Sequence, residues 1–136
     1  MGKDAQRPSP SAFPERGDMS GIGDVTMAAI EYTLGGLAQR AEVRSNNVAN
    51  SNTPGFQAST VSFESALESA LSGGDVARAS TPQVVSAGGS PDAQGNTVQI
   101  ENEMVEGMKD NLAYEAMINS YNAKLGIIRT AIGGGA

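Results

Sequence analysis

The longest regular pattern of apolar positions runs through the C-terminal third of the chain, from Ile100 to Ile132. Counting back from Ile132 in alternating steps of four and three, eight of ten positions are apolar or aromatic. This spacing is that of a coiled-coil seam, which keeps one stripe of a helix facing another helix. We therefore predict a long C-terminal helix whose seam is Ile100, Met104, Gly107, Asn111, Tyr114, Ile118, Tyr121, Leu125, Ile128 and Ile132.

A second helical stripe runs from about Ile22 to Ala49, again in steps of three and four. Asp24 is a plausible N-cap, while Gly35 and Gly36 each cost about 1 kcal/mol relative to alanine inside a helix. One such stripe alone is typical of an ordinary two-helix core, but two matched stripes at opposite ends of the chain favour a helical hairpin. The stripe consists of Met27, Ile30, Leu34, Leu37, Ala41, Arg44 and Val48.

The segment between the stripes is less regular. Apolar residues from Phe63 to Leu71 follow helical spacing, and Ser72 and two glycines close this short helix. The Gly-rich stretch that follows predicts a loop with at most a short strand around Val84 and Val85.

These patterns predict a mostly α fold. Long N- and C-terminal helices pair as an antiparallel coiled-coil hairpin, with an irregular, largely loop middle segment. The expected divisions are a disordered arm (1–18), the N-terminal helix with a turn (19–56), a short helix with a variable loop (57–99), and the C-terminal helix with a Gly tail (100–136).

Composition removes most kinds of chemistry. The 136 residues are 39% hydrophobic and 4% aromatic, so the core that one copy can bury is thin. Cysteine and histidine are absent, which removes thiol nucleophiles, imidazole bases and the usual zinc ligands. We therefore expect no enzymatic activity, cofactor, metal or small-molecule substrate.

The charge and the acidic residues fit the same expectation. A net charge of -6 without a Lys/Arg cluster makes nucleic acid and anionic membranes poor partners. Glu101, Glu103 and Glu106 are interpreted as solvated partners of the helix dipole, because no apolar pocket is expected to raise a carboxyl pKa there. No apolar run is long enough to span a membrane, and the N-terminus lacks the apolar region of a secretory signal.

The most specific string is an Asn-rich stretch after the N-terminal stripe. Four Asn within residues 46–52 compete for backbone hydrogen bonds and end the helix. Pro54 and Gly55 then suit the two central positions of a type II turn, in which the glycine takes a positive φ. The chain should reverse here.

This string resembles the signature Asn-Asn-x-Ala-Asn-x-x-Thr-(Pro/Thr)-Gly-(Tyr/Phe) of the rod and hook subunits of the bacterial flagellum, which also have two terminal helices. The resemblance covers about residues 19–132 and is strongest to proximal-rod subunits, through Phe63 to Leu67, Gly95 to Val98, Glu103 to Val105 and Tyr114. The matching motif positions are Asn46, Asn47, Ala49, Asn50, Thr53, Pro54, Gly55 and Phe56.

The resemblance implies a structural subunit of the proximal rod that polymerises helically, connects the membrane ring to the distal rod and transmits torque. Implied partners are further copies, other rod proteins, the rod-base adaptor, the membrane-ring protein and the flagellar type III export gate. It implies a periplasmic location in the basal body and export without a cleavable signal peptide. The expected assembly positions are Ile30, Leu34, Leu37, Ala41, Val48, Met104, Tyr114, Ile118, Tyr121, Leu125, Ile128 and Ile132.

Two alternatives remain open. One is another proximal-rod or axial subunit of the same family, which often has Thr where Pro54 stands. The other is a soluble coiled-coil secretion adaptor or chaperone, which would form a stable dimer and would not depend on assembly. Sedimentation of the purified chain separates these two classes.

Overall fold

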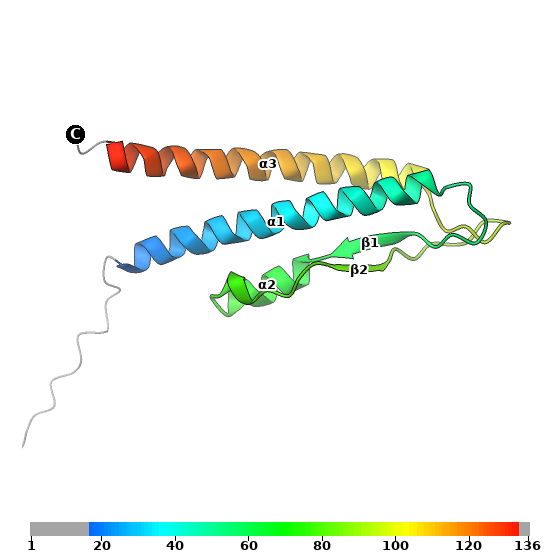
Figure 1. The fold of residues 1–136 in the computed structure, drawn as a ribbon, viewed down its shortest axis with the longest axis horizontal. Helices are drawn as coiled ribbons and strands as arrows, with labels where there is room; N and C mark the ends of the chain where they lie inside the picture. The colour runs from blue at the N-terminus through cyan, green and yellow to red at the C-terminus, as the bar shows by residue number, and fades with distance from the viewer. Residues whose placement is uncertain (1–16, 134–136) are drawn as a thin grey trace, which may run out of the picture.

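The computed structural model describes residues 17–133, with side chains from residue 23 onward. Helix α1 lies between α3 on one side and β1, β2 and α2 on the other (Figure 1). The predicted mostly α fold with a long helix near each end is confirmed. The elements are α1 (Gly17–Ala49), β1 (Ser59–Ser62), α2 (Glu64–Ser72), the 3-10 turn η1 (Val76–Arg78), β2 (Gln83–Ser86) and α3 (Ile100–Gly133).

The start of α1 differs from the prediction. The helix begins at Gly17, so Asp24 lies inside it and is not its N-cap. The predicted disordered arm falls mostly on residues 1–16, outside the described residues, and its last two residues belong to α1.

The apolar core sits between α1 and the β1–α2 connection. Leu37, Val61 and Phe63 are buried together, and the Tyr32 ring meets the Phe63 ring edge-on at a centroid distance of 6.2 Å. A Cβ on Gly36 would lie 2.5 Å from the Phe63 ring. Gly36 therefore does more than weaken the helix, because its missing side chain leaves the space in which Phe63 packs.

The short elements below α1 are partly as predicted. α2 and the strand around Val84 and Val85 are present, but β1 was not foreseen. β1 and β2 pair antiparallel with Val61 opposite Val84. β1 is a polar four-residue segment in which Val61 alone is fully buried, so it has no apolar alternation that would predict a strand.

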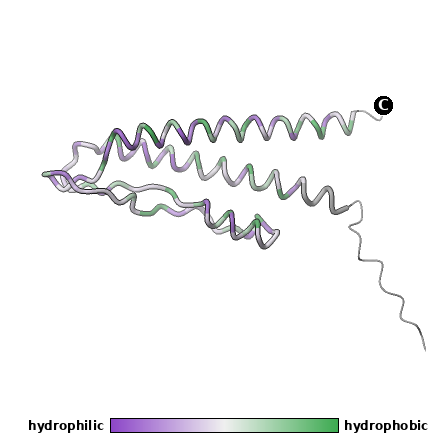
Figure 2. The backbone as a smooth tube through the Cα atoms, turned by 180° about the vertical axis from the view of Figure 1, so that it is seen from behind, coloured by the Kyte–Doolittle hydropathy of each residue, from purple (hydrophilic) through white to green (hydrophobic). Residues whose placement is uncertain are grey.

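Helix α3 runs back alongside α1, and none of its residues is buried. Hydrophobic and hydrophilic positions alternate along both long helices (Figure 2). The predicted seam of α3 only partly faces α1, since Gly107, Ile118, Tyr121 and Leu125 are half-covered. The remaining seam positions are exposed, namely Ile100, Met104, Asn111, Tyr114, Ile128 and Ile132.

The predicted stripe of α1 is likewise only partly buried. Ile30 and Leu37 are buried and Leu34 is half-buried, but Ala41 and Val48 are exposed. In the described part of the chain, no helix combines the length and the hydropathy that crossing a membrane requires.

Candidate functional site

Asn47 joins three elements at the end of α1. Its side chain is buried, its Nδ2 donates to the Ser59 carbonyl at 2.7 Å, and its Oδ1 accepts from the Ser59 N–H at 3.1 Å. The amide thus bonds to β1 as a neighbouring strand would. Nδ2 also donates to Oε1 of Glu103 on α3 at 3.1 Å. Asn47 therefore fixes β1 and α3 against α1 at one point.

Asn96, in the loop before α3, closes the end of α1. Its buried Nδ2 donates to the carbonyls of Asn50 and Thr53, at 2.9 and 2.8 Å. Its Oδ1 accepts from the Val98 N–H, and the Asp92 carboxylate accepts from the Asn96 N–H. Two carbonyls of the turn that follows α1 thereby gain a further hydrogen bond from a segment more than forty residues away.

The turn after α1 has the predicted geometry. Gly55 has a φ of 74°, and the Phe56 N–H donates to the Thr53 carbonyl at 3.2 Å. The Gly55 N–H donates to the Gln94 carbonyl, and the Thr97 N–H donates to the Phe56 carbonyl. We call Asn47, Asn50, Thr53, Gly55 and Asn96 the turn cluster.

The other motif positions are outside this cluster. Asn46 is exposed and accepts a hydrogen bond from Asn50 Nδ2 at its carbonyl. Ala49 and Pro54 are exposed, and Phe56 is half-buried. The motif therefore has one buried residue, Asn47, which fixes the end of α1, and mostly exposed residues that are free to meet another molecule.

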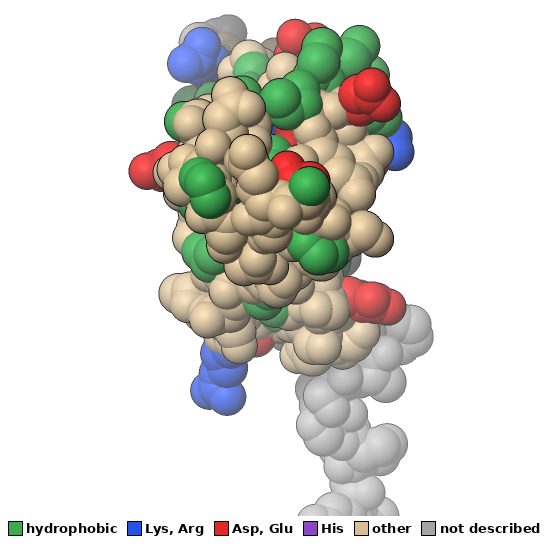
Figure 3. All heavy atoms as spheres, turned by 90° about the vertical axis from the view of Figure 1, so that its right-hand side faces the viewer, with side chains coloured by type: hydrophobic (Ala, Val, Ile, Leu, Met, Phe, Trp, Pro, Cys, Tyr) green, Lys and Arg blue, Asp and Glu red, His purple; other side chains and the backbone are tan. Residues whose placement is uncertain are grey.

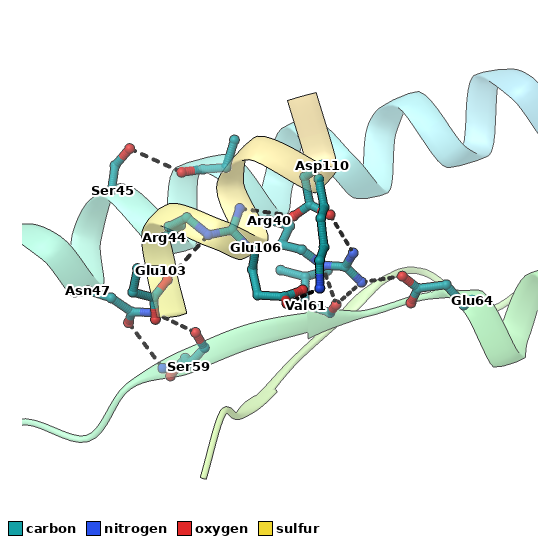
Figure 4. A network of polar contacts seen from close by, with 12 residues as sticks. Arg40, Arg44, Ser45, Asn47, Ser59, Val61, Glu64, Glu103, Glu106 and Asp110 are labelled. Carbon is teal, nitrogen blue, oxygen red and sulfur yellow. Dashed lines mark hydrogen bonds and ion pairs between the residues drawn. The ribbon is translucent and has the colours of Figure 1, made fainter. Parts of the chain in front are cut away.

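A group of ion pairs holds the middle of α1 to both of its neighbours (Figure 4). The Arg40 guanidinium donates to the Val61 carbonyl from Nη2 at 2.7 Å and to Asp110 Oδ1 from Nη1 at 3.3 Å. It also lies 4.6 Å from the Phe63 ring centre, a cation–π contact. Arg40 therefore contacts the core, β1 and α3.

Arg44 continues this contact one turn later. Its Nη1 lies 2.9 Å from Asp110 Oδ2, and its Nε lies 3.3 Å from Glu103 Oε2. The side chains of Arg44, Asp110 and Glu103 are all 14–15% exposed. We call Arg40, Arg44, Glu103 and Asp110 the ion-pair cluster.

This cluster corrects the interpretation of Glu103 as a solvated dipole partner. Its side chain is largely covered and contacts Arg44 and Asn47. Glu101 and Glu106 are exposed, as expected. The arginine that interrupted the apolar stripe of α1 was the one signal for the cluster in the sequence.

Glu64, at the start of α2, extends the cluster toward solvent. Burial raises the pKa of its carboxyl, but the hydrogen bond from Arg40 and the backbone N–H groups of Phe63 and Glu64 outweigh this and lower the pKa overall. A hydrogen bond from Lys109 likewise lowers the pKa of the exposed Glu106 carboxyl.

Beside the ion-pair cluster, α1 and α3 leave an open groove. Six predicted seam residues, three from each helix, line this groove. The Arg44 side chain lies between the two helices here, because its Cδ is 3.2 Å from where a Cβ of Gly107 would be. We call this the outer groove. Its lining residues are Ala41, Arg44, Ser45, Val48, Ala49, Glu103, Met104, Gly107, Met108 and Asn111.

Within residues 17–133, no group of three or more acidic side chains is placed to hold a metal ion. What the site offers is a fixed helix end and an apolar groove. Such features suit the binding of another protein segment better than bond chemistry.

Comparisons with known proteins match the same region. A family model described as "Flagella basal body rod protein" matches residues 33–57, which hold the second half of α1 and the whole Asn-rich turn. The flagellar basal body rod protein FlgB of Aeromonas hydrophila is 32% identical over 118 residues, covering 76% of this chain and 89% of that protein. FlgB of Bacillus subtilis strain 168 is 27% identical over 122 residues, covering 81% of this chain and 95% of that protein.

Proposed function

The chain belongs to the family of flagellar basal body rod proteins, and from this we propose that it is a structural subunit of the proximal rod. Its copies polymerise helically with other rod components and connect the membrane ring to the distal rod. The observation that carries the proposal is the similarity to FlgB proteins over nearly their whole length.

The exposed surface of α3 supports an assembled state. Soluble monomers rarely expose large apolar patches, yet large apolar side chains are exposed in both the first half of α3 and its last turns. In the assembled rod, α1 and α3 form an antiparallel coiled-coil hairpin whose seam is completed by helices of neighbouring subunits. The side chains left for neighbours to cover are Ile100, Met104, Val105, Met108, Leu112, Tyr114, Ile127, Ile128 and Ile132.

The turn cluster and the ion-pair cluster suit the transmission of torque. Both tie α3 to α1, and Asn47 and Arg40 also tie β1 to the pair. A twisting force on one helix therefore passes to the other through directed polar contacts, without any catalytic step.

The remaining partners follow from the proposed place in the rod. The subunit meets the rod-base adaptor and the membrane-ring protein, and it passes the type III export gate without a cleavable signal peptide. Its place is the periplasmic part of the basal body.

The test is complementation of a strain that lacks the gene for this chain. We expect motility to return and the chain to be present in isolated basal bodies. Sedimentation of the purified chain provides the second measurement, because a secretion adaptor or chaperone forms a stable soluble dimer. Such a dimer, together with absence from basal bodies, would contradict the proposal.

A further inference from the structure

The sheet of β1 and β2 has two edges, and the alternation of its backbone groups decides what each edge offers. In an antiparallel pair, the N–H and C=O groups of successive residues point alternately toward the partner strand and away from it. One step beyond the pair Ser59–Ser86, the Ala87 N–H donates to the Ala58 carbonyl at 2.9 Å. Residues 58 and 87 therefore point toward each other, and Ser59 and Ser86 point their backbone groups outward.

The outer edge of β1 is covered by α1. By the same alternation, the outward backbone groups of β1 belong to Ser59 and Val61. Asn47 bonds to both backbone groups of Ser59, and the Arg40 guanidinium donates to the Val61 carbonyl at 2.7 Å. The contacts with α1 thus agree with the alternation.

The outer edge of β2 is open. There the alternation assigns the outward N–H and C=O groups to Val84 and Ser86. All four residues of β2 are exposed, and within residues 17–133 nothing hydrogen-bonds to these outward backbone groups. Val84 is 55% exposed and Val85 is 40% exposed. An open strand edge of this kind is a template for a further strand.

The sequence before α1 contains a segment whose residues fit such an edge. Residues 8–14 carry no charge, and Pro8, Pro10 and Pro14 all stand at even positions. In an extended strand these positions face one edge, and proline is tolerated on an edge that makes no hydrogen bonds. Residues that precede a proline are also biased toward extended backbone. The residues that keep an N–H for the other edge are Ser9, Ser11 and Phe13.

Neither segment brings an unpaired charge into the contact. β2, like residues 8–14, contains no charged side chain. Seen from the end of the molecule at which the loops lie, uncharged side chains and backbone form most of the surface, and charged side chains lie mainly toward its margins (Figure 3). Pairing of the two segments therefore buries no charge without a partner.

We propose that the open edge of β2 binds residues 9–13 of a second copy of this chain as a third strand. The antiparallel register that sets Phe13 beside Val84 pairs an aromatic with a β-branched side chain, a favourable cross-strand pair. It also places Ser11 beside Ser86. The contact goes beyond the proposed function, because it involves neither the seam of the long helices nor the outer groove.

A copy cannot place its own residues 9–13 at this edge. The chain from Phe13 to Gly17 spans at most about 14 Å when fully extended. Leu37, which packs against Val61 of β1, lies about 30 Å along α1 from Gly17. The start of α1 and the sheet lie toward opposite ends of the molecule (Figure 1). The third strand must therefore come from another copy.

The test uses the absence of cysteine from the natural chain. Full-length Phe13→Cys and Val84→Cys chains are purified, mixed and equilibrated in a thiol–disulfide buffer, and the linked species are identified by mass spectrometry. Residues opposite each other in a hydrogen-bonded pair are about 5.5 Å apart at Cα, within the range of a disulfide. We expect the mixed dimer to be the main linked species.

Val85→Cys is the matched control on β2. Val85 is exposed on the same strand, but its side chain points to the opposite face of the sheet from that of Val84. A mixture of Val85→Cys and Phe13→Cys should therefore give much less mixed dimer.

Two proline variants of the Phe13→Cys chain test the hydrogen bonds themselves. Ser11→Pro removes an N–H that faces β2 and should lower the yield of mixed dimer about fivefold, the loss expected for one hydrogen bond. Ala12→Pro removes an N–H on the opposite edge and should leave the yield unchanged. Both positions precede α1, so neither substitution alters a residue of the fold described above.

Three results would overturn the proposal. Absence of the mixed dimer, or equal yields from Val84→Cys and Val85→Cys, would show no contact beyond random collision. Val84→Cys dimers in excess of the mixed dimer would show that β2 pairs with β2 of another copy. Equal effects of Ser11→Pro and Ala12→Pro would show that the segment does not bind as a strand. None of these results bears on the rod assignment, which depends on recovery of the chain in basal bodies.

Discussion

The two faces of α1 are built in different ways. Toward β1 and α2, α1 packs apolar side chains, with Leu37 against Phe63 and Val61 in a small buried core. Toward α3, it makes ion pairs of Arg40 and Arg44 with carboxylates and a hydrogen bond from Asn47 to Glu103. Apolar burial contributes about 25 cal/mol per Å², whereas ion pairs with largely covered side chains lose much of their Coulomb energy to desolvation. The apolar face stabilises the fold of one copy. The ionic face orients α3 on α1 but adds little to its stability.

This difference indicates which contact opens first. An element with no buried residue and few apolar contacts is expected to dissociate before the core unfolds. The same weakness leaves α3 available to neighbouring subunits.

The largest expected effect comes from the core face. Phe63→Ala should lower the free energy of unfolding by about 3–5 kcal/mol, because it empties the centre of the core. Met104→Ala, on the exposed side of α3, should change it by less than about 0.5 kcal/mol in the purified chain. Urea denaturation measures both. Equal losses would show that the two faces do not differ as described.

The next effect tests whether Phe63 needs the space left by the missing side chain of Gly36. Gly36→Ala places a methyl group where the ring lies, so it should cost about 1–3 kcal/mol by overpacking. Gly35→Ala is the matched control, since a Cβ there meets nothing within 4 Å. It should stabilise α1 by up to about 1 kcal/mol. If both variants are stabilised, Phe63 does not need the space.

A smaller effect is expected on the ionic face. Asp110→Asn weakens the pairs with both arginines and should lower the protection of α3 amides from hydrogen exchange by about 1 kcal/mol, while amides near Leu37 keep theirs. Glu115→Gln removes an exposed carboxylate from the same helix and serves as the control. Added salt should change α3 protection less than Asp110→Asn does, because largely covered pairs are screened only weakly. An equal loss of amide protection in α3 and around Leu37 would contradict the difference between the ionic and the apolar face of α1.

The smallest effect concerns pH. The pKa of Glu64 is lower in the folded chain, so its contribution to stability is present above the unfolded pKa and is lost as the pH falls through the folded pKa, below about 4.5. Because the side chain is 60% exposed, the loss should stay below about 1 kcal/mol. Glu64→Gln should remove this part of the acid dependence of unfolding, and an unchanged profile would show that the pair with Arg40 contributes nothing.

Local patterns predicted the elements better than their contacts. The two long helices, the short helix, the strand at Val84 and the positive φ of Gly55 all follow from periodicity or turn chemistry within a few residues. Which residues of α3 face α1 could not be predicted, because Arg40 and Arg44 on α1 pair with carboxylates about seventy residues away.

Of the candidate site, the sequence pointed to the Asn-rich string but not to Arg40, Asp110 or Asn96, and not to the role of any residue. The sequence pointed to the Asn-rich string, yet it could not show that Asn47 bonds to β1 or that Asn96 closes the helix end. These bonds join segments 12 to 56 residues apart, and no local pattern records them. Gly36 was interpreted as a weakness for the same reason, since the ring that needs its space lies 27 positions later in the chain.

The bonds of Asn47 also set a sequence of events in time. Its bond to Ser59 closes a loop of 12 residues, whereas its bond to Glu103 spans 56. Longer loops cost more entropy to close and form later, so the early partner is β1 and the late partner is α3. When the chain emerges from its N-terminus onward, the contact with α3 cannot form until residues 47 and 103 have both emerged. Asn47 is therefore expected to bond to β1 first and to α3 last, so that α3 is attached to α1 only after β1 is in place.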